Sequence, residues 1–313
     1  AEEHNKNEIV ELVLSSLISC DSSNETLLEK ELQKVDDEPD KNKIKEIFNN
    51  VFKSLDNDIF KQQEGYEFED SVGTTATIAL IFNKTTYVVH RGDSPTYAGY
   101  KNEQIRRITA NHNLDDDGEL EMLTKEVKKP HFYYLKDRFD RCYGSPRYWL
   151  DDGDLGGLKI TTFFGNTYNF TSKKFPDDLP QEREMARRYS TQSGLIEINN
   201  QDIDFILVTS DGFEDVEIFL RDSVKKFKED NEEETKAASF LMGKNGFYDE
   251  ETDDATFVSI FFKQSKDETV KNLYKRINNK KFKYWGSLDK EEKFAYRKSI
   301  FSNMTKKKTQ ACE

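Results

Sequence analysis

Four short runs of β-branched and aromatic residues, three of them next to an acidic motif, constrain this chain most. They cover residues 75–82, 86–90, 205–209 and 256–262. Apolar runs of four to eight residues bounded by Gly, Asn and Asp predict strands. Aspartates stand where these strands begin or end, so we expect their carboxylates to meet at one end of a sheet. Oxygen ligands of this kind suit hard cations such as Mg²⁺ or Mn²⁺.

The remaining patterns predict an α+β protein with helices packed outside stacked sheets. Apolar residues at helical spacing predict a helix over residues 44–60, and the acidic stretch 21–42 is expected to be a loop. Residues 83–85 separate two strand runs, as in a hairpin. Further helices are expected over 9–18, 217–228 and 233–242, and further strands over 95–99, 104–108 and 158–164.

Composition excludes several classes of protein. The 313 residues carry a formal net charge of −13, which argues against a nucleic-acid binder over its whole length. The charge is uneven, because residues 265–313 hold 14 Lys/Arg against 6 Asp/Glu. Three widely spaced cysteines form no disulfide framework, which favours an intracellular, most simply cytoplasmic, compartment. No apolar run reaches the length of a membrane span.

Three acidic motifs are the candidates for chemistry. Asp211 and Asp215 lie four residues apart around Gly212, so a turn and the helix after it would present both carboxylates to one cation. Asp253 precedes the last strand run, and Asp93 follows the run 86–90. Taken singly, each motif is also typical of an ordinary turn or helix cap.

Together these motifs resemble the type 2C, metal-dependent protein serine/threonine phosphatases. The resemblance rests on Gly-Thr-Thr-Ala-Thr at 73–77, Gly-Asp-Ser at 92–94, Ser-Asp-Gly-x-x-Asp at 210–215 and Asp-Asp-x-Thr at 253–256. Residues 107–112 and 158–166 resemble further family segments in the same order. The resemblance to this family implies a four-layer α/β/β/α sandwich of two antiparallel sheets flanked by helices.

The resemblance also implies a metal site with two cations, Mg²⁺ or Mn²⁺, and a third, weaker one. Asp211 and Asp253 match ligands of the paired metals, and Asp93 and Asp215 match residues of the third. Thr75 matches a threonine beside the cleft. The implied reaction is attack of a metal-bridging hydroxide on phosphoserine or phosphothreonine in a phosphoprotein, without a covalent enzyme intermediate.

The start of the chain departs from the family pattern. An early Arg followed by Glu-Asp is absent, and residues 1–6 fall where the family has Asp-Gly-His. His4 then matches a histidine thought to act as general acid, and Glu2 replaces the bridging Asp. A solvated terminal histidine is the alternative for His4.

Further departures lie within the later motifs. Asn111 replaces an Asp, and Thr162 and Asn166 replace Arg and Asp.

Two interpretations of these departures remain open. In the first, a segment upstream of Ala1 supplies the missing motifs and the protein is a phosphatase. In the second, the protein is a catalytically impaired pseudophosphatase that serves as a binding or structural scaffold in a larger assembly.

The sequence predicts a type 2C phosphatase-like domain over residues 1–263 and a basic, partly helical tail over 264–313. Within the domain, residues 113–157 form an aromatic-rich insert with some helix over 120–126. This insert either docks a peptide or protein partner or forms a small core of its own. The tail interleaves cations with aromatic residues, a pattern compatible with nucleic acid, an acidic polymer or simple solvation.

Overall fold

The fold was examined in a computed structural model of the chain. It describes residues 26–62, 73–102, 104–127, 132–136, 142–147, 159–165, 180–211, 257–262 and 281–283. No helix in this described part is long and apolar enough to cross a membrane.

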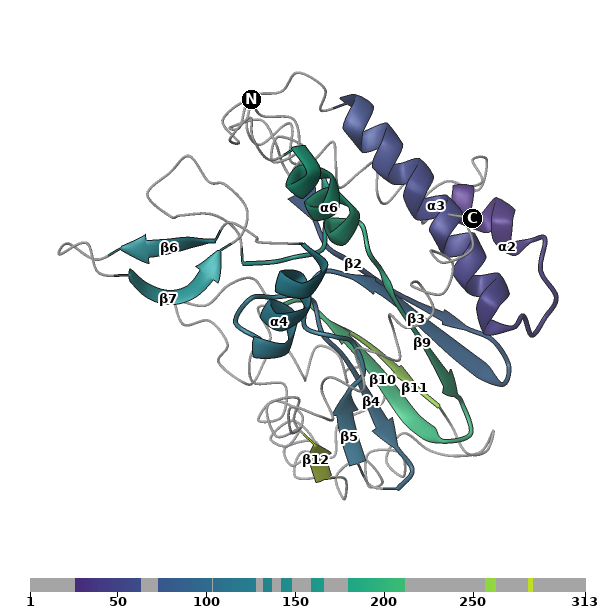
Figure 1. Cartoon of the computed structure of the whole chain (residues 1–313). Coiled ribbons are helices and arrows are strands. Elements are labelled where there is room, and N and C mark those ends of the chain that lie inside the picture. Colours follow the sequence, from purple (N-terminus) through teal and green to yellow (C-terminus); the bar gives the residue numbers. More distant parts are fainter. Residues whose placement is uncertain are drawn as a thin grey trace, which may run out of the picture.

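Helix α3 (Lys41–Gln62) covers one face of a three-stranded sheet (Figure 1). Its buried side chains recur at helical spacing: Ile44, Ile47, Phe48, Val51, Phe52, Leu55 and Ile59. The short helix α2 (Leu27–Leu32) precedes it and begins with a capping box, in which Thr26 and Glu29 bond each other's backbone N–H. Residues 26–42 therefore contain a helix and the start of α3, and the expected loop over 21–42 is wrong there.

The first sheet has the strand order β2-β3-β9 and is antiparallel throughout. Its strands are β2 (Ala76–Ile81), β3 (Thr85–Arg91) and β9 (Gly194–Asn199). Strands β2 and β3 form the expected hairpin, and β9 was not predicted. Because β9 pairs with β3 over its full length, a segment more than a hundred residues away completes the sheet that carries Asp93.

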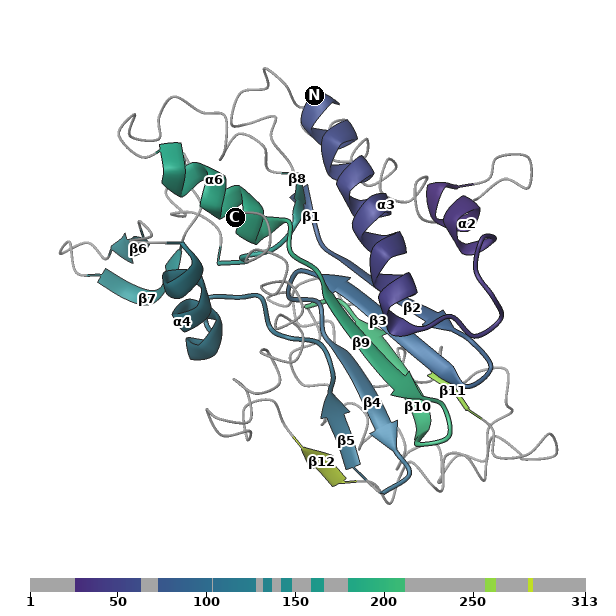
Figure 2. The same ribbon diagram turned by 45° about the vertical axis from the view of Figure 1, so that its right-hand side comes forward.

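The second sheet has the order β11-β10-β4-β5-β12. Its strands are β4 (Thr96–Tyr100), β5 (Gln104–Arg107), β10 (Ile203–Thr209), β11 (Phe257–Phe261) and β12 (Lys281–Lys283). Four of them are antiparallel, whereas β12 lies parallel to β5. Residues 281–283, expected in the tail, thus extend this sheet at its edge (Figure 2).

Alternation along β3 explains the layering. Tyr87 and Val89 belong to the core beneath α3, whereas Val88 belongs to the core between the two sheets. Successive side chains of a strand point to opposite faces, so one strand supplies both layers. Val88 packs with Ala98 and Ile206 of the second sheet. The described residues therefore form a helix layer over two stacked sheets, as the sandwich prediction requires.

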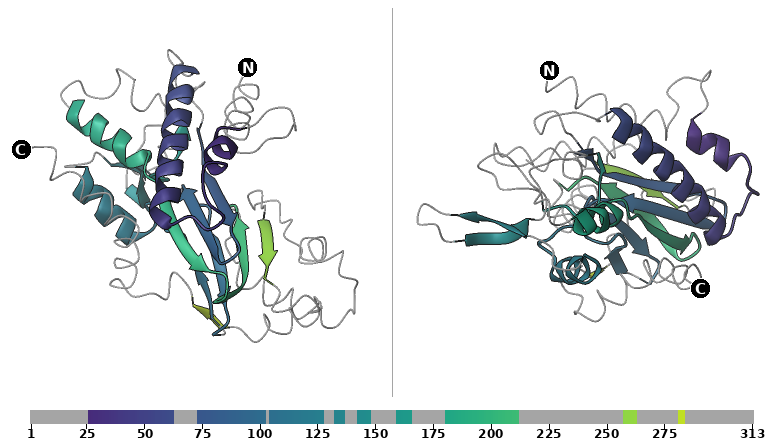
Figure 3. Two further views of the ribbon diagram at one scale, coloured as in Figure 1. Left: turned by 90° about the vertical axis from the view of Figure 1, so that its right-hand side faces the viewer. Right: turned by 45° about the horizontal axis from the view of Figure 1, so that its top comes forward.

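Smaller elements cluster at one end of the sandwich (Figure 3). They are β1 (Gly73–Thr74) paired with β8 (Phe164–Gly165), helices α4 (Asp117–Glu126) and α6 (Pro180–Ser190), and the hairpin β6 (Tyr133–Lys136) with β7 (Cys142–Arg147). The expected strand over 158–164 is reduced to an isolated bridge at Ile160 and the two-residue β8. Helix α6 was not predicted, whereas α4 confirms the helix expected in the insert.

Three predicted helices, over 9–18, 217–228 and 233–242, lie outside the described residues. The division between domain and tail stays a prediction.

Candidate metal centre

A tight turn at the end of β3 places Asp93. Gly92 has φ 111°, a conformation that L side chains rarely adopt, and a Cβ there would overlap the side chain of Thr75. The Gly92 N–H donates to Thr162 Oγ1 at 2.8 Å. Thr75 Oγ1 lies 2.9 Å from Ser94 Oγ, which ties the residue between β1 and β2 to the same turn. The strand end is therefore held by two other segments of the fold, at Thr75 and at Thr162.

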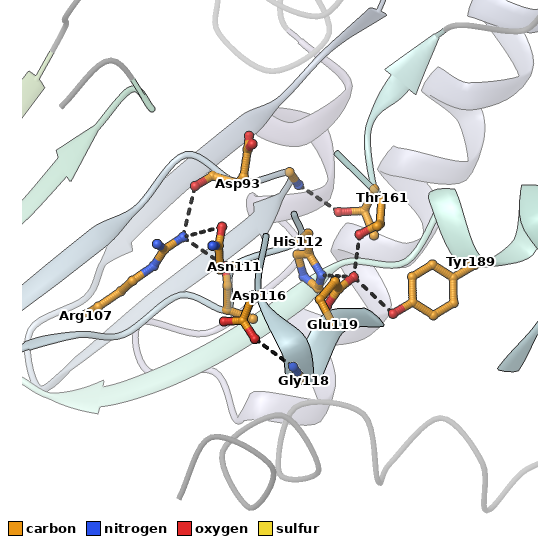
Figure 4. A network of polar contacts seen from close by, with 12 residues as sticks. Asp93, Arg107, Asn111, His112, Asp116, Gly118, Glu119, Thr161 and Tyr189 are labelled. Carbon is orange, nitrogen blue, oxygen red and sulfur yellow. Dashed lines mark hydrogen bonds and ion pairs between the residues drawn. The ribbon is translucent and has the colours of Figure 1, made fainter. Parts of the chain in front are cut away.

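Arg107, the last residue of β5, fastens this turn from the second sheet (Figure 4). Its guanidinium donates to the backbone carbonyls of Asp93 at 2.9 Å, Thr109 at 3.1 Å and Ala110 at 3.3 Å. It also donates to Asn111 Oδ1 at 3.4 Å. The rigid fork of donors on arginine suits this multiple anchoring.

The Asp93 carboxyl is itself largely buried, with 9% of the residue exposed. Asn113 Nδ2 donates to its Oδ2 at 2.8 Å. Burial raises the pKa of Asp93, and the nearby Asp211 carboxylate raises it further, while the bond from Asn113 acts in the opposite sense. The Thr209 N–H donates to the Pro95 carbonyl at 3.0 Å, and Asp211 and Asp93 each lie two residues from this bond, so the two aspartates lie at the same end of the paired segments although they are far apart in sequence.

Asp211 lies two residues beyond β10, which pairs with β4 directly after the Gly-Asp-Ser turn. Asp93 follows a strand of the first sheet and Asp211 follows a strand of the second, so carboxylates from both sheets lie at one end of the sandwich. Two mutually repelling carboxylates, with oxygen donors around them and no thiolate ligand among the described neighbours, fit a hard divalent cation. Within the residues that the structure describes, no group of three or more His, Cys, Asp or Glu side chains is arranged to hold a metal.

The structure describes three of the seven predicted site residues: Thr75, Asp93 and Asp211. It brings all three to this region. Glu2, His4, Asp215 and Asp253 lie outside the described residues.

Sequence reasoning missed what Arg107, Asn113 and Thr162 do at this site. Arg107 was noted only as part of a family-like segment, Thr162 only as a departure and Asn113 only as the start of the insert. No local pattern identifies these partners, since each reaches the turn from another strand or loop.

A buried polar network lies next to the turn. The His90 and His112 rings stack with their centroids 5.2 Å apart, and neither residue is exposed. Glu119 Oε1 accepts a bond from Tyr189 Oη at 3.0 Å and one from Thr161 Oγ1, and lies 3.2 Å from His112 Nδ1. Burial lowers the pKa of His90 well below its usual value, with His112 and Arg107 adding to the effect. This network joins α4 and α6 to the segment that follows β5.

Comparisons with known proteins agree with this geometry. Residues 17–127 match the family model of protein phosphatase 2C. The chain is 25% identical over 204 residues to "Protein phosphatase 2C 57" of Arabidopsis thaliana, covering 58% of this chain and 48% of that protein. The chain thus spans about half the length of this curated relative.

Two solved structures share the fold. A serine-threonine phosphatase 2C from Toxoplasma gondii superposes with a TM-score of 0.53 at 17% identity, covering 83% of this chain and 81% of that one. A C. elegans sex determining protein gives 0.51 at 16% identity, covering 80% and 53%.

The two stacked sheets and the aspartates at their strand ends thus define a protein with the type 2C phosphatase fold. Within that fold, residues 17–127 match the family model of protein phosphatase 2C, so the chain resembles this family in both sequence and fold. The fold and family resemblance inferred from the sequence are confirmed.

Proposed function

We propose that this protein is a metal-dependent protein serine/threonine phosphatase that uses Mg²⁺ or Mn²⁺. The observation that carries the proposal is the position of Asp93 and Asp211 at one end of the stacked sheets, where the Thr209 N–H donates to the Pro95 carbonyl at 3.0 Å. Holding two carboxylates together costs free energy unless a cation neutralises them. Its substrates would be phosphoserine or phosphothreonine side chains of phosphoproteins.

Asp93 and Asp211 would hold the cations, together with Asp215 and Asp253 as the sequence predicts. When bound, the cations would lower the pKa of a coordinated water and neutralise charge on the phosphoryl oxygens. Glu2 and His4 are the remaining proposed participants, as a metal ligand and as a general acid towards the leaving group.

The chain's own residues position this site. Arg107 fixes the backbone at Asp93, and Asn113 orients the Asp93 carboxyl by donating to Oδ2 at 2.8 Å. Thr75 supports the turn through Ser94 and its contact at Gly92. We therefore assign Thr75 a positioning role instead of direct catalysis.

The test is turnover of p-nitrophenyl phosphate with and without Mn²⁺. We expect Mn²⁺-dependent turnover that falls by about 100-fold or more in Asp211→Asn and Asp93→Asn, since a lost metal ligand removes several kcal/mol of transition-state stabilisation. Asp58→Asn, the same change at an exposed site on α3, should leave turnover unchanged. Unchanged turnover in Asp211→Asn would contradict the proposed metal site.

A pseudophosphatase scaffold is the second candidate, and two departures from the family pattern favour it. Thr162 accepts the backbone N–H of Gly92, and Asn111 accepts from Arg107. Both positions thus serve structural hydrogen bonds where the family has charged residues. The two candidates differ in one result: if wild type binds Mn²⁺ in calorimetry but shows no turnover, the scaffold function holds and the phosphatase function fails.

A further inference from the structure

Helices α3 and α6 lie side by side (Figures 2 and 3). Residues of both helices line a groove that contains none of the predicted metal ligands. Its volume is about 200 Å³. Residues of α3 line it at helical spacing, as do residues of α6, so two helix faces point towards each other across a gap. The main contributors are Asn49, Lys53, Asn57 and Phe60 of α3 with Arg187 and Arg188 of α6.

The lining is polar and cationic where facing helices normally pack apolar side chains. Four cationic and two acidic side chains line the groove, a local balance of +2 in a chain of −13. Both acids are already engaged: Asp56 Oδ1 accepts from Arg91 at 2.6 Å, and Glu184 Oε1 accepts from Arg188 at 2.8 Å. The groove therefore carries a positive excess from its remaining cations.

Those cations are Lys53 and Arg187. Within the described part of the chain, neither side chain makes a direct hydrogen bond or ion pair. Arg187 is nonetheless oriented, because its guanidinium lies 4.8 Å from the centre of the Phe60 ring. Stacking on an aromatic face leaves the N–H edge of a guanidinium free to donate in its own plane, which suits bidentate recognition of phosphate.

The floor of the groove is rigid. Arg91, 2% exposed, is held by Asp56, by the Thr191 carbonyl at 2.8 Å and by Ser193 Oγ at 3.3 Å. Its guanidinium also lies 3.8 Å from the centre of the Phe164 ring. A fixed floor and an oriented Arg187 lower the conformational cost of binding a dianion.

From these observations we infer that the α3–α6 groove binds a phosphate dianion, presented by a phosphorylated side chain, at a site separate from the candidate metal centre. Lys53 and Arg187 contact the phosphate, and Asn49 and Asn57 offer amide donors. The groove is smaller than the roughly 300–1,000 Å³ of pockets that hold drug-sized ligands, which favours a single phosphorylated side chain over a nucleotide. This inference does not depend on turnover by the protein.

Calorimetric titration of the full chain in EDTA tests the inference, because chelation keeps cations out of the metal centre. The probes are inorganic phosphate, N-acetyl-phosphoserine N-methylamide and the same serine compound without phosphate. We expect saturable binding of the phosphoserine compound, weaker binding of inorganic phosphate and none of the serine compound. Tighter binding of inorganic phosphate would instead identify a free-phosphate site and overturn the phosphorylated side chain as ligand.

Variants locate the binding. Lys53→Gln and Arg187→Gln should each weaken it about tenfold, as expected for loss of one charge-assisted contact. Lys61→Gln, on the same helix outside the groove, and Asp211→Asn, at the metal centre, should bind like wild type. Unchanged affinity in both groove variants, or loss in Asp211→Asn, overturns the inference. Circular dichroism melting confirms that the exposed substitutions leave the fold intact.

Discussion

Breaking the buried ion pair between Arg91 and Asp56 should destabilise the fold more than any exposed charge change. Arg91 Nη1 donates to Asp56 Oδ1 at 2.6 Å, with 2% and 14% of the side chains exposed. In Asp56→Leu the guanidinium stays buried without its counter-charge. We expect a loss of about 3 kcal/mol in the free energy of unfolding, the lower end for broken buried pairs, since two hydrogen bonds to Arg91 remain.

The double variant shows whether the loss of unfolding free energy comes from leaving one buried charge without its partner. Arg91→Met alone should cost about 2 kcal/mol, because burial already raises the pKa of Asp56 and the carboxyl can take up a proton. Arg91→Met with Asp56→Leu removes both charges and places apolar groups between Phe52 and Phe164. Its loss should be about 2 kcal/mol or more below the sum of the single losses.

Urea unfolding followed by circular dichroism measures these values. The matched control is Arg188→Met, which breaks an exposed pair on α6 and should cost under about 0.5 kcal/mol. Losses below about 1 kcal/mol in Asp56→Leu, or strict additivity in the double variant, would refute the reasoning. Either result would mean that the Arg91–Asp56 ion pair contributes little to holding α3 against the end of β3.

Three further predictions concern the surroundings of the metal centre. Gly92→Ala should lower the unfolding free energy by about 2–3 kcal/mol because of its φ of 111°, whereas Gly118→Ala in the first turn of α4 should not lower it. Burial lowers the pKa of His90 well below 6.5, so the folded state keeps His90 neutral while the unfolded state takes up a proton, and stability should fall as the pH drops below about 6.5. His90→Leu should flatten that slope in urea unfolding. Arg107→Lys should weaken Mn²⁺ binding about tenfold by calorimetry, while Arg106→Lys, over the Tyr100 ring, should not.

The apolar pattern was sufficient for a helix with one buried face and for a continuous apolar run that forms a central strand. The helix expected over 44–60 corresponds to α3, and the strong run at 205–209 corresponds to β10. It missed α6, which has few apolar residues, and the short strand β9. It also failed for residues 158–164, where a β-rich run forms only a bridge and a two-residue strand. In residues 158–164 the length of the strand is limited by the neighbouring segments that it can pair with, and not by the β-propensity of its residues.

The sequence alone determined the family resemblance and the residue types of the metal centre. Spacing identified Asp93 and Asp211 because short acidic motifs at strand ends are local features that survive in the linear order. Only the tertiary structure decided which groups hold them: Arg107 and Asn113 reach the turn from other elements. The groove between α3 and α6 is likewise invisible in the sequence, since its cations come from helices more than a hundred residues apart. Such contacts join residues that are far apart in the sequence, so no short sequence segment contains both partners.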